Sequence, residues 1–200
     1  MEVDGLARRT PAERRARLID AAVRVIAAHG VEGATTRRIA AAAEMSLASL
    51  HYLFESKEAL FFAIWEEQVR ALKERAEADA HRDGLAPTAA RLLRQTFDWF
   101  ESDQEFAQVQ LEITFWALRR DAALGVGTYD LHVGLMEAAL RAGRLADEPE
   151  DRIGALARLI VALADGISVQ WFCYRDPDRL AADIDAAQVA LAAFTQARRP

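Results

Sequence analysis

The stretch that decides the fold is residues 35–57, TTRRIAAAAEMSLASLHYLFESK, in which two short helical patterns meet at a tight turn. The first pattern predicts a helix at about residues 36–43, with a threonine at its start as the capping residue. The second predicts a helix at about residues 47–53, capped by Ser46. Because only residues 44–46 lie between them, the two helices must cross directly.

The apolar residues of this stretch indicate how the two helices pack. Ile39, Leu50 and Phe54 fall on the inner faces, and the run of alanines before Glu44 leaves no bulk at the crossing. Two helices held close at a steep angle leave one face of the second free to enter a DNA major groove, about 12 Å wide. That free face is expected to carry Leu47, Ala48, Ser49, His51, Tyr52 and Leu53.

At these residues the chain resembles the tetracycline-repressor (TetR) family of transcriptional regulators, whose DNA-binding segment reads roughly T-T-x-x-I-A-x-x-A-G-V-S-x-G-x-L-Y-x-H-F-x-S-K-E-x-L. The resemblance covers about residues 14–65 and implies an all-α fold, with a three-helix DNA-binding head before a larger helical body that dimerises. The matching residues are Thr35, Thr36, Ile39, Ala40, Ala43, Met45, Ser46, Leu50, Phe54, Ser56, Lys57, Glu58 and Leu60.

The chain departs from the family pattern at the turn and near the end of the second helix. Glu44 stands where the family usually places a glycine with positive φ, a conformation that costs another residue about 1 kcal/mol. His51 and Leu53 replace the usual Tyr and His, and Tyr52 supplies a phenol one position later. The contacts to phosphate from this helix are therefore expected to differ in detail from the family's.

Side-chain chemistry and the resemblance together suggest roles in DNA binding. Arg37 is the best candidate for bidentate recognition of guanine, while Leu47, Ala48 and Leu53 offer methyl groups that suit thymine methyls. Phosphate contacts are expected from Thr36, His51, Tyr52 and Lys57. The expected DNA-binding set is Thr36, Arg37, Arg38, Ser46, Leu47, Ala48, Ser49, His51, Tyr52 and Lys57. The alternative for the whole stretch is an ordinary helical hairpin in an all-α core.

The net charge of -6 is unevenly divided along the chain. Residues 1–60 hold nine basic and eight acidic side chains, so this segment is at +1 and the remainder carries -7. Such asymmetry suits a local phosphate-binding surface on an otherwise acidic protein. Five arginines near the start are predicted either to approach phosphate or to begin a solvated helix: Arg8, Arg9, Arg14, Arg15 and Arg17.

Length and composition favour a globular protein of one or two domains, since 200 residues with 52% hydrophobic content bury a substantial core. The first 17 residues lack an apolar run, and no later segment approaches the roughly 20 uncharged residues that cross a bilayer. A cytoplasmic protein without membrane partners is expected. The single cysteine, Cys173, excludes an intrachain disulfide and a multi-cysteine zinc site.

Helical periodicity dominates and predicts an all-α protein of about nine helices. Gly30 is suited to end the first helix, and Gly125 with Gly127 indicates a break before the seventh. The division expected from the sequence is an arm and helix-turn-helix domain at residues 1–58 and a ligand-binding and dimerisation domain at residues 59–200. The first four expected helices lie at about residues 11–29, 36–43, 47–53 and 57–79, and the apolar positions of the other five fall within residues 92–100, 106–117, 131–140, 153–171 and 180–194.

The second half gathers aromatic side chains with a few polar ones, a composition typical of small-molecule sites. Glu112 facing tryptophans would suit a cationic ligand through cation-π contacts. The alternative for these residues is a solid aromatic core. The expected ligand-binding set is Trp99, Phe100, Glu112, Phe115, Trp116, Tyr129, His132, Met136, Gln170, Trp171 and Tyr174.

The eighth predicted helix is apolar around most of its circumference, so it must pack on two sides. Together with the ninth helix it is expected to form a four-helix interface in a homodimer. Small side chains there allow close approach and larger ones supply buried area. The expected interface set is Ala157, Ile160, Ala164, Ile167, Ser168, Leu191 and Phe194.

An enzyme is the main alternative from another functional class. A helical di-metal site needs Glu-x-x-His pairs, and none of the four histidines has a glutamate three residues before it. The sequence also lacks a phosphate loop and a nucleophile elbow. We therefore expect no catalytic, metal or cofactor site. The favoured interpretation is a repressor that binds double-stranded operator DNA and is released by an unidentified small-molecule effector; a ligand-independent regulator is the second.

Overall fold

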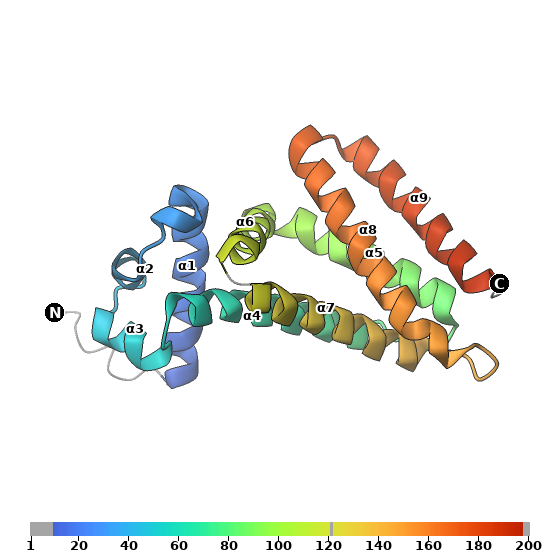
Figure 1. Ribbon diagram of the computed structural model, residues 1–200, viewed down its shortest axis with the longest axis horizontal. Coiled ribbons are helices and arrows are strands. Elements are labelled where there is room, and N and C mark those ends of the chain that lie inside the picture. Colours follow the sequence, from blue (N-terminus) through green and yellow to red (C-terminus); the bar gives the residue numbers. More distant parts are fainter. Residues whose placement is uncertain (1–9, 121, 198–200) are drawn as a thin grey trace. The chain divides into compact units, whose positions relative to one another are not determined.

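The computed structural model describes residues 10–120 and 122–197, and every regular element in these segments is helical (Figure 1). This confirms the all-α prediction and the number of main helices. They are α1 (Pro11–Gly33), α2 (Thr36–Ala42), α3 (Leu47–Leu53), α4 (Lys57–Ala78), α5 (Leu85–Ser102), α6 (Gln104–Arg120), α7 (Ala122–Gly143), the 3-10 turn η2 (Glu150–Arg152), α8 (Ile153–Tyr174) and α9 (Pro177–Gln196).

Helix boundaries follow local capping chemistry at several ends. Thr10 and Glu13 form a reciprocal capping box at the start of α1. Gly30 has φ 67°, which confirms the predicted end of the regular helix, and one further turn follows it. The predicted break at Gly125 is wrong, because α7 begins at Ala122 and continues through that glycine. A Cβ at Gly125 would lie 3.1 Å from a methyl carbon of Leu118, so the glycine allows close packing instead.

Contacts divide the chain into two compact units, which differ from the division expected at residue 58. The first unit comprises residues 1–67 and 103–125, and the second comprises residues 68–102 and 126–200. Helix α6 falls in the first unit because it packs along α1.

The first unit is organised around α1, whose inner face is fully apolar. Leu18, Ala22 and Ile26 have no exposed surface and pack in one cluster with Ile39 of α2 and Leu50 of α3. Residues from the start of α4 and from α6 complete this cluster. The three N-terminal helices are therefore fixed by a common core.

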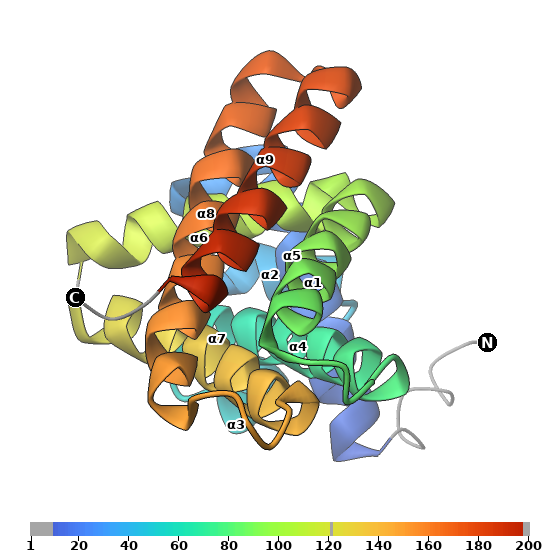
Figure 2. The ribbon, with the colours of Figure 1, turned by 90° about the vertical axis from the view of Figure 1, so that its right-hand side faces the viewer.

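The second unit contains the α8–α9 hairpin, whose helices run side by side (Figure 2) and both pack on α5. Asp176 caps α9 and Pro177 occupies its first turn. By length and composition alone, Glu150–Tyr174 is apolar enough to cross a membrane, with a mean hydropathy of 1.5 over 18 residues. The apolar face of α8 packs against α5 and α9 in the protein core.

Candidate DNA-binding surface and effector cavity

The turn between α2 and α3 is closed by side-chain caps and backbone hydrogen bonds. Thr35 Oγ1 accepts from Arg38 N (3.2 Å). Ser46 Oγ accepts from Ser49 N (3.0 Å). Met45 N donates to the carbonyl oxygen of Ala40 (2.9 Å). The two short helices are thus held at a defined angle without a flexible linker.

Glu44 occupies the turn with φ 54°, so the left-handed conformation expected at the family's glycine position is present. Its carboxylate forms an ion pair with the Arg17 guanidinium. Arg17 Nε also donates to the Ala43 carbonyl oxygen (2.7 Å). The Glu44 side chain, which makes the positive φ unfavourable, therefore also connects the turn to α1 through its ion pair.

The outer surface of α3 is largely uncharged. Ala48, His51 and Tyr52 are exposed, and 80% of the surface of Tyr52 is accessible. Ser49 Oγ lies 2.8 Å from Ser46 Oγ, so the two hydroxyls pair with each other. The expectation that Leu53 stands on this surface is wrong, because Leu53 packs against the core of the first unit.

The two arginines that begin α2 differ in their surroundings. Arg37 is exposed, and no hydrogen bond or ion pair joins it to another described residue. The Arg38 guanidinium donates to the Gly33 carbonyl oxygen (2.8 Å). Arg37 is therefore the better placed of the two for a contact outside the protein.

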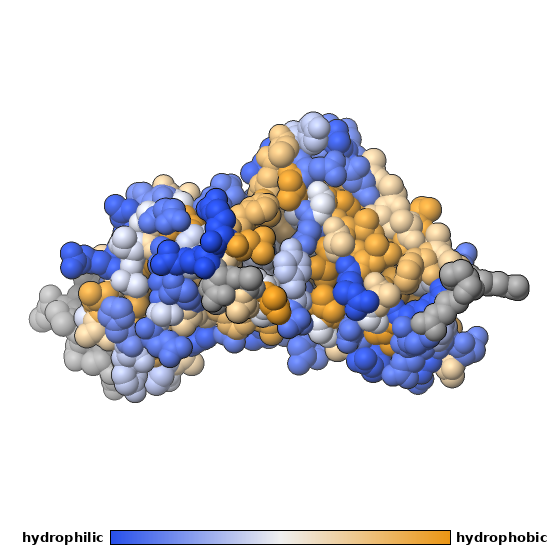
Figure 3. All heavy atoms as spheres, in the orientation of Figure 1, coloured by the Kyte–Doolittle hydropathy of each residue, from blue (hydrophilic) through white to orange (hydrophobic). Residues whose placement is uncertain are grey.

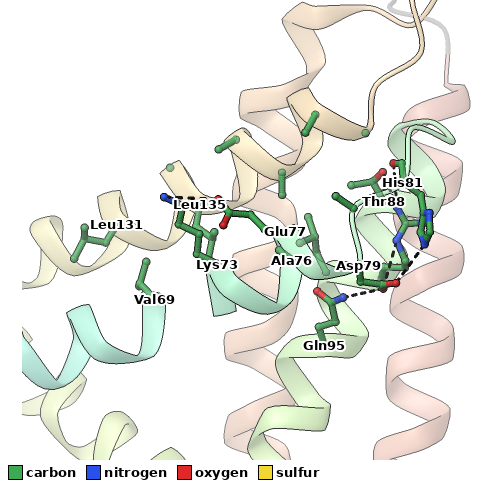
Figure 4. A pocket seen from close by; sticks show the side chains of 18 residues that line it. Val69, Lys73, Ala76, Glu77, Asp79, His81, Thr88, Gln95, Leu131 and Leu135 are labelled. Carbon is green, nitrogen blue, oxygen red and sulfur yellow. Dashed lines mark hydrogen bonds and ion pairs between the residues drawn. The ribbon is translucent and has the colours of Figure 1, made fainter. Parts of the chain in front are cut away.

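The second unit contains a cavity of about 360 Å³ between the C-terminal half of α4, α5 and α7 (Figure 4). This volume lies at the lower end of the range for small-molecule sites, about 300–1,000 Å³. Eleven of its lining residues are aliphatic or glycine: Val69, Ala76, Ala80, Leu92, Leu131, Gly134, Leu135, Ala138, Ala139, Ala142 and Gly143. The polar or charged ones are Lys73, Glu77, Asp79, His81, Thr88, Arg91 and Gln95.

One end of the cavity carries a compact hydrogen-bonded cluster around Asp79 (Figure 4). Asp79 Oδ2 accepts from Gln95 Nε2 (3.0 Å), and Oδ1 lies 3.3 Å from His81 Nε2. Arg91 binds the Asp83 carboxylate with both terminal nitrogens, at 2.6 and 3.0 Å. The Arg91 guanidinium beside Asp83 holds the pKa of that carboxyl below its usual range.

Comparison with known proteins identifies the family. Residues 18–64 match the model described as bacterial regulatory proteins, tetR family. The chain is 32% identical over 184 residues to the HTH-type transcriptional repressor Rv1474c of Mycobacterium tuberculosis, covering 88% of this chain and 92% of that protein. This chain belongs to the tetR family.

Two further similarities extend over most of the chain. The HTH-type nicotine-responsive transcriptional repressor HdnoR of Paenarthrobacter nicotinovorans is 32% identical over 164 residues, which is 80% of this chain and 84% of that protein. The crystal structure of the multidrug binding protein EbrR complexed with ethidium superposes with a TM-score of 0.68 at 26% identity. That alignment covers 91% of this chain and 98% of EbrR.

The structure corrects the expected phosphate contact of Lys57. Its Nζ donates to the Val31 carbonyl oxygen (2.8 Å) and lies 5.1 and 5.7 Å from the ring centroids of Phe61 and Trp116. Burial is the main cause that lowers the pKa of Lys57, partly opposed by Glu32. The ammonium is therefore directed at internal partners of this tetR-family head.

Two of the N-terminal arginines also have internal partners, whereas Arg14 Nε is buried without a hydrogen bond to another described residue. Arg15 forms an ion pair with Glu66 (3.0 Å) and lies 5.1 Å from the centroid of the Phe54 ring, while Arg17 binds the turn at Glu44. Arg8 and Arg9 lie outside the described residues. Arg15 and Arg17 thus stabilise the packing of the first unit.

Two of the expected ligand-binding residues instead build the core of the first unit. Glu112 Oε2 accepts from Val31 N (3.3 Å), so it holds the end of α1. Trp116 is 3% exposed and packs edge-on to Phe61, with ring centroids 5.2 Å apart. Phe115 is on the same helix and is 49% exposed. None of these three lines the cavity.

The expected aromatic residues of α5 and α8 form a packed cluster. Phe100 meets Trp99 at 5.4 Å, and it meets Phe172 at 6.5 Å between ring centroids. Trp99 and Trp171 are 7% and 8% exposed. Since neither Trp99, Phe100 nor Trp171 borders the cavity, the solid-core alternative describes them.

The remaining expected ligand residues are likewise placed away from the cavity wall. The Tyr129 hydroxyl donates to Asp165 Oδ2 (2.7 Å), and Met136 is 4% exposed in the core. Gln170 Oε1 accepts from Arg179 (3.2 Å), and the Arg179 guanidinium also stacks 3.7 Å from the centroid of the Tyr174 ring.

His132 is held by hydrogen bonds within the second unit. Its Nδ1 lies 3.0 Å from the Thr128 carbonyl oxygen, and its Nε2 lies 3.2 Å from the side-chain carbonyl oxygen Oε1 of Gln68. Both partners are oxygens that only accept, so a neutral ring, which has one N–H, donates to one of them. Desolvation by burial lowers the pKa of His132, which favours this neutral form.

The cavity residues were not predicted because the cavity is marked in the sequence by small side chains and not by aromatic ones. On α7 the sequence places Gly134, Ala138 and Ala142 four residues apart, beside a second row at Leu135 and Ala139. Residues at this spacing share one helix face. Such a row facing Ala76 of α4 leaves space between the helices, and the row itself was visible in the sequence.

The expected dimer residues mostly face the interior of a single chain. Ala157, Ile160 and Leu191 have no exposed surface, and Ile167 and Ser168 are 6% and 5% exposed. These five pack within the chain because α8 has a buried side against α5 and α9, and their place in an interface stays a prediction. Ala164 and Phe194 are only partly buried.

Proposed function

We propose that this chain is a repressor that binds operator DNA through α2 and α3 and is released by a small molecule in the α4–α5–α7 cavity. The observation that carries the proposal is the capped α2–turn–α3 unit, with an exposed, uncharged α3 surface beside an unpaired Arg37 among the described residues. Both relatives compared above are named as transcriptional repressors, and one as nicotine-responsive.

Within this proposal, Arg37 and the outer residues of α3 contact base edges, and His51 and Tyr52 contact phosphate. Thr36 and Ser46 remain in the proposed site. They lie at the starts of the two helices, where backbone N–H groups can donate to phosphate. Arg38 and Ser49 contact DNA after their hydrogen bonds with Gly33 and Ser46 are broken. Lys57 is omitted from the direct contacts.

We also infer that two copies pair through the outward faces of α8 and α9. Figure 3 shows hydrophobic residues at the surface in the region of these helices. Val169 and Val189 are 39% and 70% exposed there, and Ala186 and Ala190 of α9 are exposed too. Small side chains on adjacent helices allow the close approach of a four-helix interface.

A dimer suits a two-part operator, because its two heads would meet successive major grooves about 34 Å apart. An effector that favours another head separation would weaken binding. A coupling free energy of about 1–3 kcal/mol gives roughly 5- to 150-fold release.

The test begins with selection of bound duplexes from a random DNA pool at fixed salt concentration. The enriched sequence should bind the parent protein in a gel-shift titration, whereas Arg37→Ala should bind it more weakly and Arg119→Ala, an exposed arginine of α6, should bind it equally. Failure to enrich any sequence would refute the DNA-binding role. Val189→Glu should convert dimers to monomers in sedimentation, and an unchanged mass would refute the proposed interface.

A further inference from the structure

The cavity wall excludes one kind of ligand chemistry that the sequence composition suggested. None of the described residues that line it is a phenylalanine, tyrosine or tryptophan. A flat cation is bound in proteins by stacking on aromatic faces or by an unpaired carboxylate. The aromatic clusters of this chain pack elsewhere, so the cavity offers aliphatic surface in their place.

The charged groups at the cavity are already paired with one another. Lys73 Nζ lies 3.8 Å from Glu77 Oε1, and Arg91 is bound bidentately to Asp83. Asp79 has Gln95 and His81 as neighbours at hydrogen-bond distance. An ionic ligand would have to compete with one of these pairs, because every charged side chain of the described wall already has a partner.

The same cluster retains capacity to accept a hydrogen bond. A carboxylate has about four lone-pair sites, and the side-chain carbonyl oxygen of Gln95 accepts from none of the described residues while its amide donates to Asp79. A neutral donor, such as a hydroxyl group, would be recognised there without disturbing the ion pairs. A carboxylate on the ligand would instead meet Glu77 and Asp79.

From this lining we propose that the effector is an uncharged aliphatic molecule with a hydroxyl-type donor at one end, its chain lying along the α4 and α7 walls. The chain contacts Val69, Leu131 and Leu135, and the donor reaches the Asp79–Gln95 end (Figure 4). The inference rests on the proposed function only in taking this cavity as the effector site. The chemistry of the bound molecule follows from the cavity itself.

Four probes test this class by calorimetric titration of the full chain without DNA: 1-octanol, octanoate, octylammonium and ethidium. DNA is omitted because ethidium itself binds DNA. We expect octanol to bind at least tenfold more tightly than either charged octyl compound, and ethidium to give no saturable binding. Equal or tighter binding of a charged octyl compound, saturable ethidium binding, or no octanol binding would each overturn the inference.

A matched pair of variants shows whether octanol occupies this cavity. Ala76→Phe places a ring in the cavity from α4, while Ala78→Phe places the same ring on the exposed side two residues later. We expect Ala76→Phe to lower octanol affinity at least tenfold and Ala78→Phe to keep it. Should Ala76→Phe unfold, as judged by circular dichroism, Ala138→Phe fills the cavity from α7. Retained affinity in a folded cavity-filling variant would refute the site.

Operator release is measured separately by gel shift with 1-octanol. If octanol binds but does not release the operator, the ligand class stands and the effector role proposed for the cavity fails. If octanoate or octylammonium releases the operator and octanol does not, the repressor function stands and the ligand class fails. The two failures are therefore distinguishable.

Discussion

The two compact units fill the space between their helices in different ways. In the first, α6 meets α1 through large side chains such as Trp116 and Ile113, both almost completely buried. In the second, α7 faces α4 through alanines and glycines, and a cavity of about 360 Å³ remains. Side-chain volume at facing positions thus separates a fully packed N-terminal unit from a unit with a cavity between its helices.

Truncation of Trp116 should produce the largest effect and tests the rigid side of this comparison. Trp116→Ala should lower the free energy of unfolding by about 3–5 kcal/mol, because it removes a fully packed ring between α6 and α4. Chemical denaturation measures this loss. The neighbouring Phe115→Ala, at a side chain that is 49% exposed, should cost far less. Equal effects of the two variants would show that the first unit is not packed as described.

Substitutions of Arg37 and Lys57 compare a cation on the protein surface with one that contacts internal partners. Arg37→Ala should weaken operator binding by about 1–3 kcal/mol and relax preference at one base pair, with unfolding unchanged. Lys57→Ala should instead reduce the free energy of unfolding by about 1–2 kcal/mol, since it leaves the Val31 carbonyl oxygen without its donor. Gel-shift and denaturation titrations measure both quantities. A loss of about one unit of salt slope in Lys57→Ala would restore its phosphate role.

The contrast between the units also explains what could be predicted from the sequence. The head was predictable because caps at Thr35 and Ser46 and a turn at Glu44 act over three or four residues. The cavity was assigned to the wrong residues, because an aromatic residue such as Trp116 serves a core or a pocket equally well by composition. Only the long-range packing of α6 on α1 decides its place. Likewise, α8 is apolar on several sides, and its pattern does not say which side faces α5.

Acidification should affect the second unit through His132. The folded-state pKa of this histidine lies below its ordinary value of about 6.5, mainly because burial disfavours the charged ring. The unfolded chain therefore binds the extra proton first, and stability is complete above about pH 6.5 and falls as pH drops toward the folded pKa. The loss is at most about 1.4 kcal/mol per pH unit.

Thermal melts between pH 8 and pH 5 measure this slope, with His132→Gln as the control that removes the titrating group. We expect the variant to lose less stability on acidification than the parent protein. Identical pH profiles would show that His132 is not the group that titrates on unfolding.

The smallest effect is expected at Glu44, where strain and attraction act in opposite directions. Its φ of 54° costs a non-glycine residue about 1 kcal/mol, which Glu44→Gly relieves. The same change removes the ion pair with Arg17, worth about 0–1 kcal/mol at a partly exposed site, and adds freedom to the unfolded chain. The net change in unfolding free energy should therefore lie within about 0.5 kcal/mol of zero.

Glu44→Gln separates the two contributions, because it keeps the side-chain strain and removes the charge. It should be less stable than both the parent protein and Glu44→Gly, and denaturant midpoints compare all three. Operator affinity should barely change in Glu44→Gly, since Arg17 still donates to the Ala43 carbonyl oxygen and holds the turn against α1. A loss above about 1 kcal/mol in Glu44→Gly would mean that the Arg17 pair outweighs the backbone strain. The carboxylate would then be the feature that sets the position of α3 relative to α1.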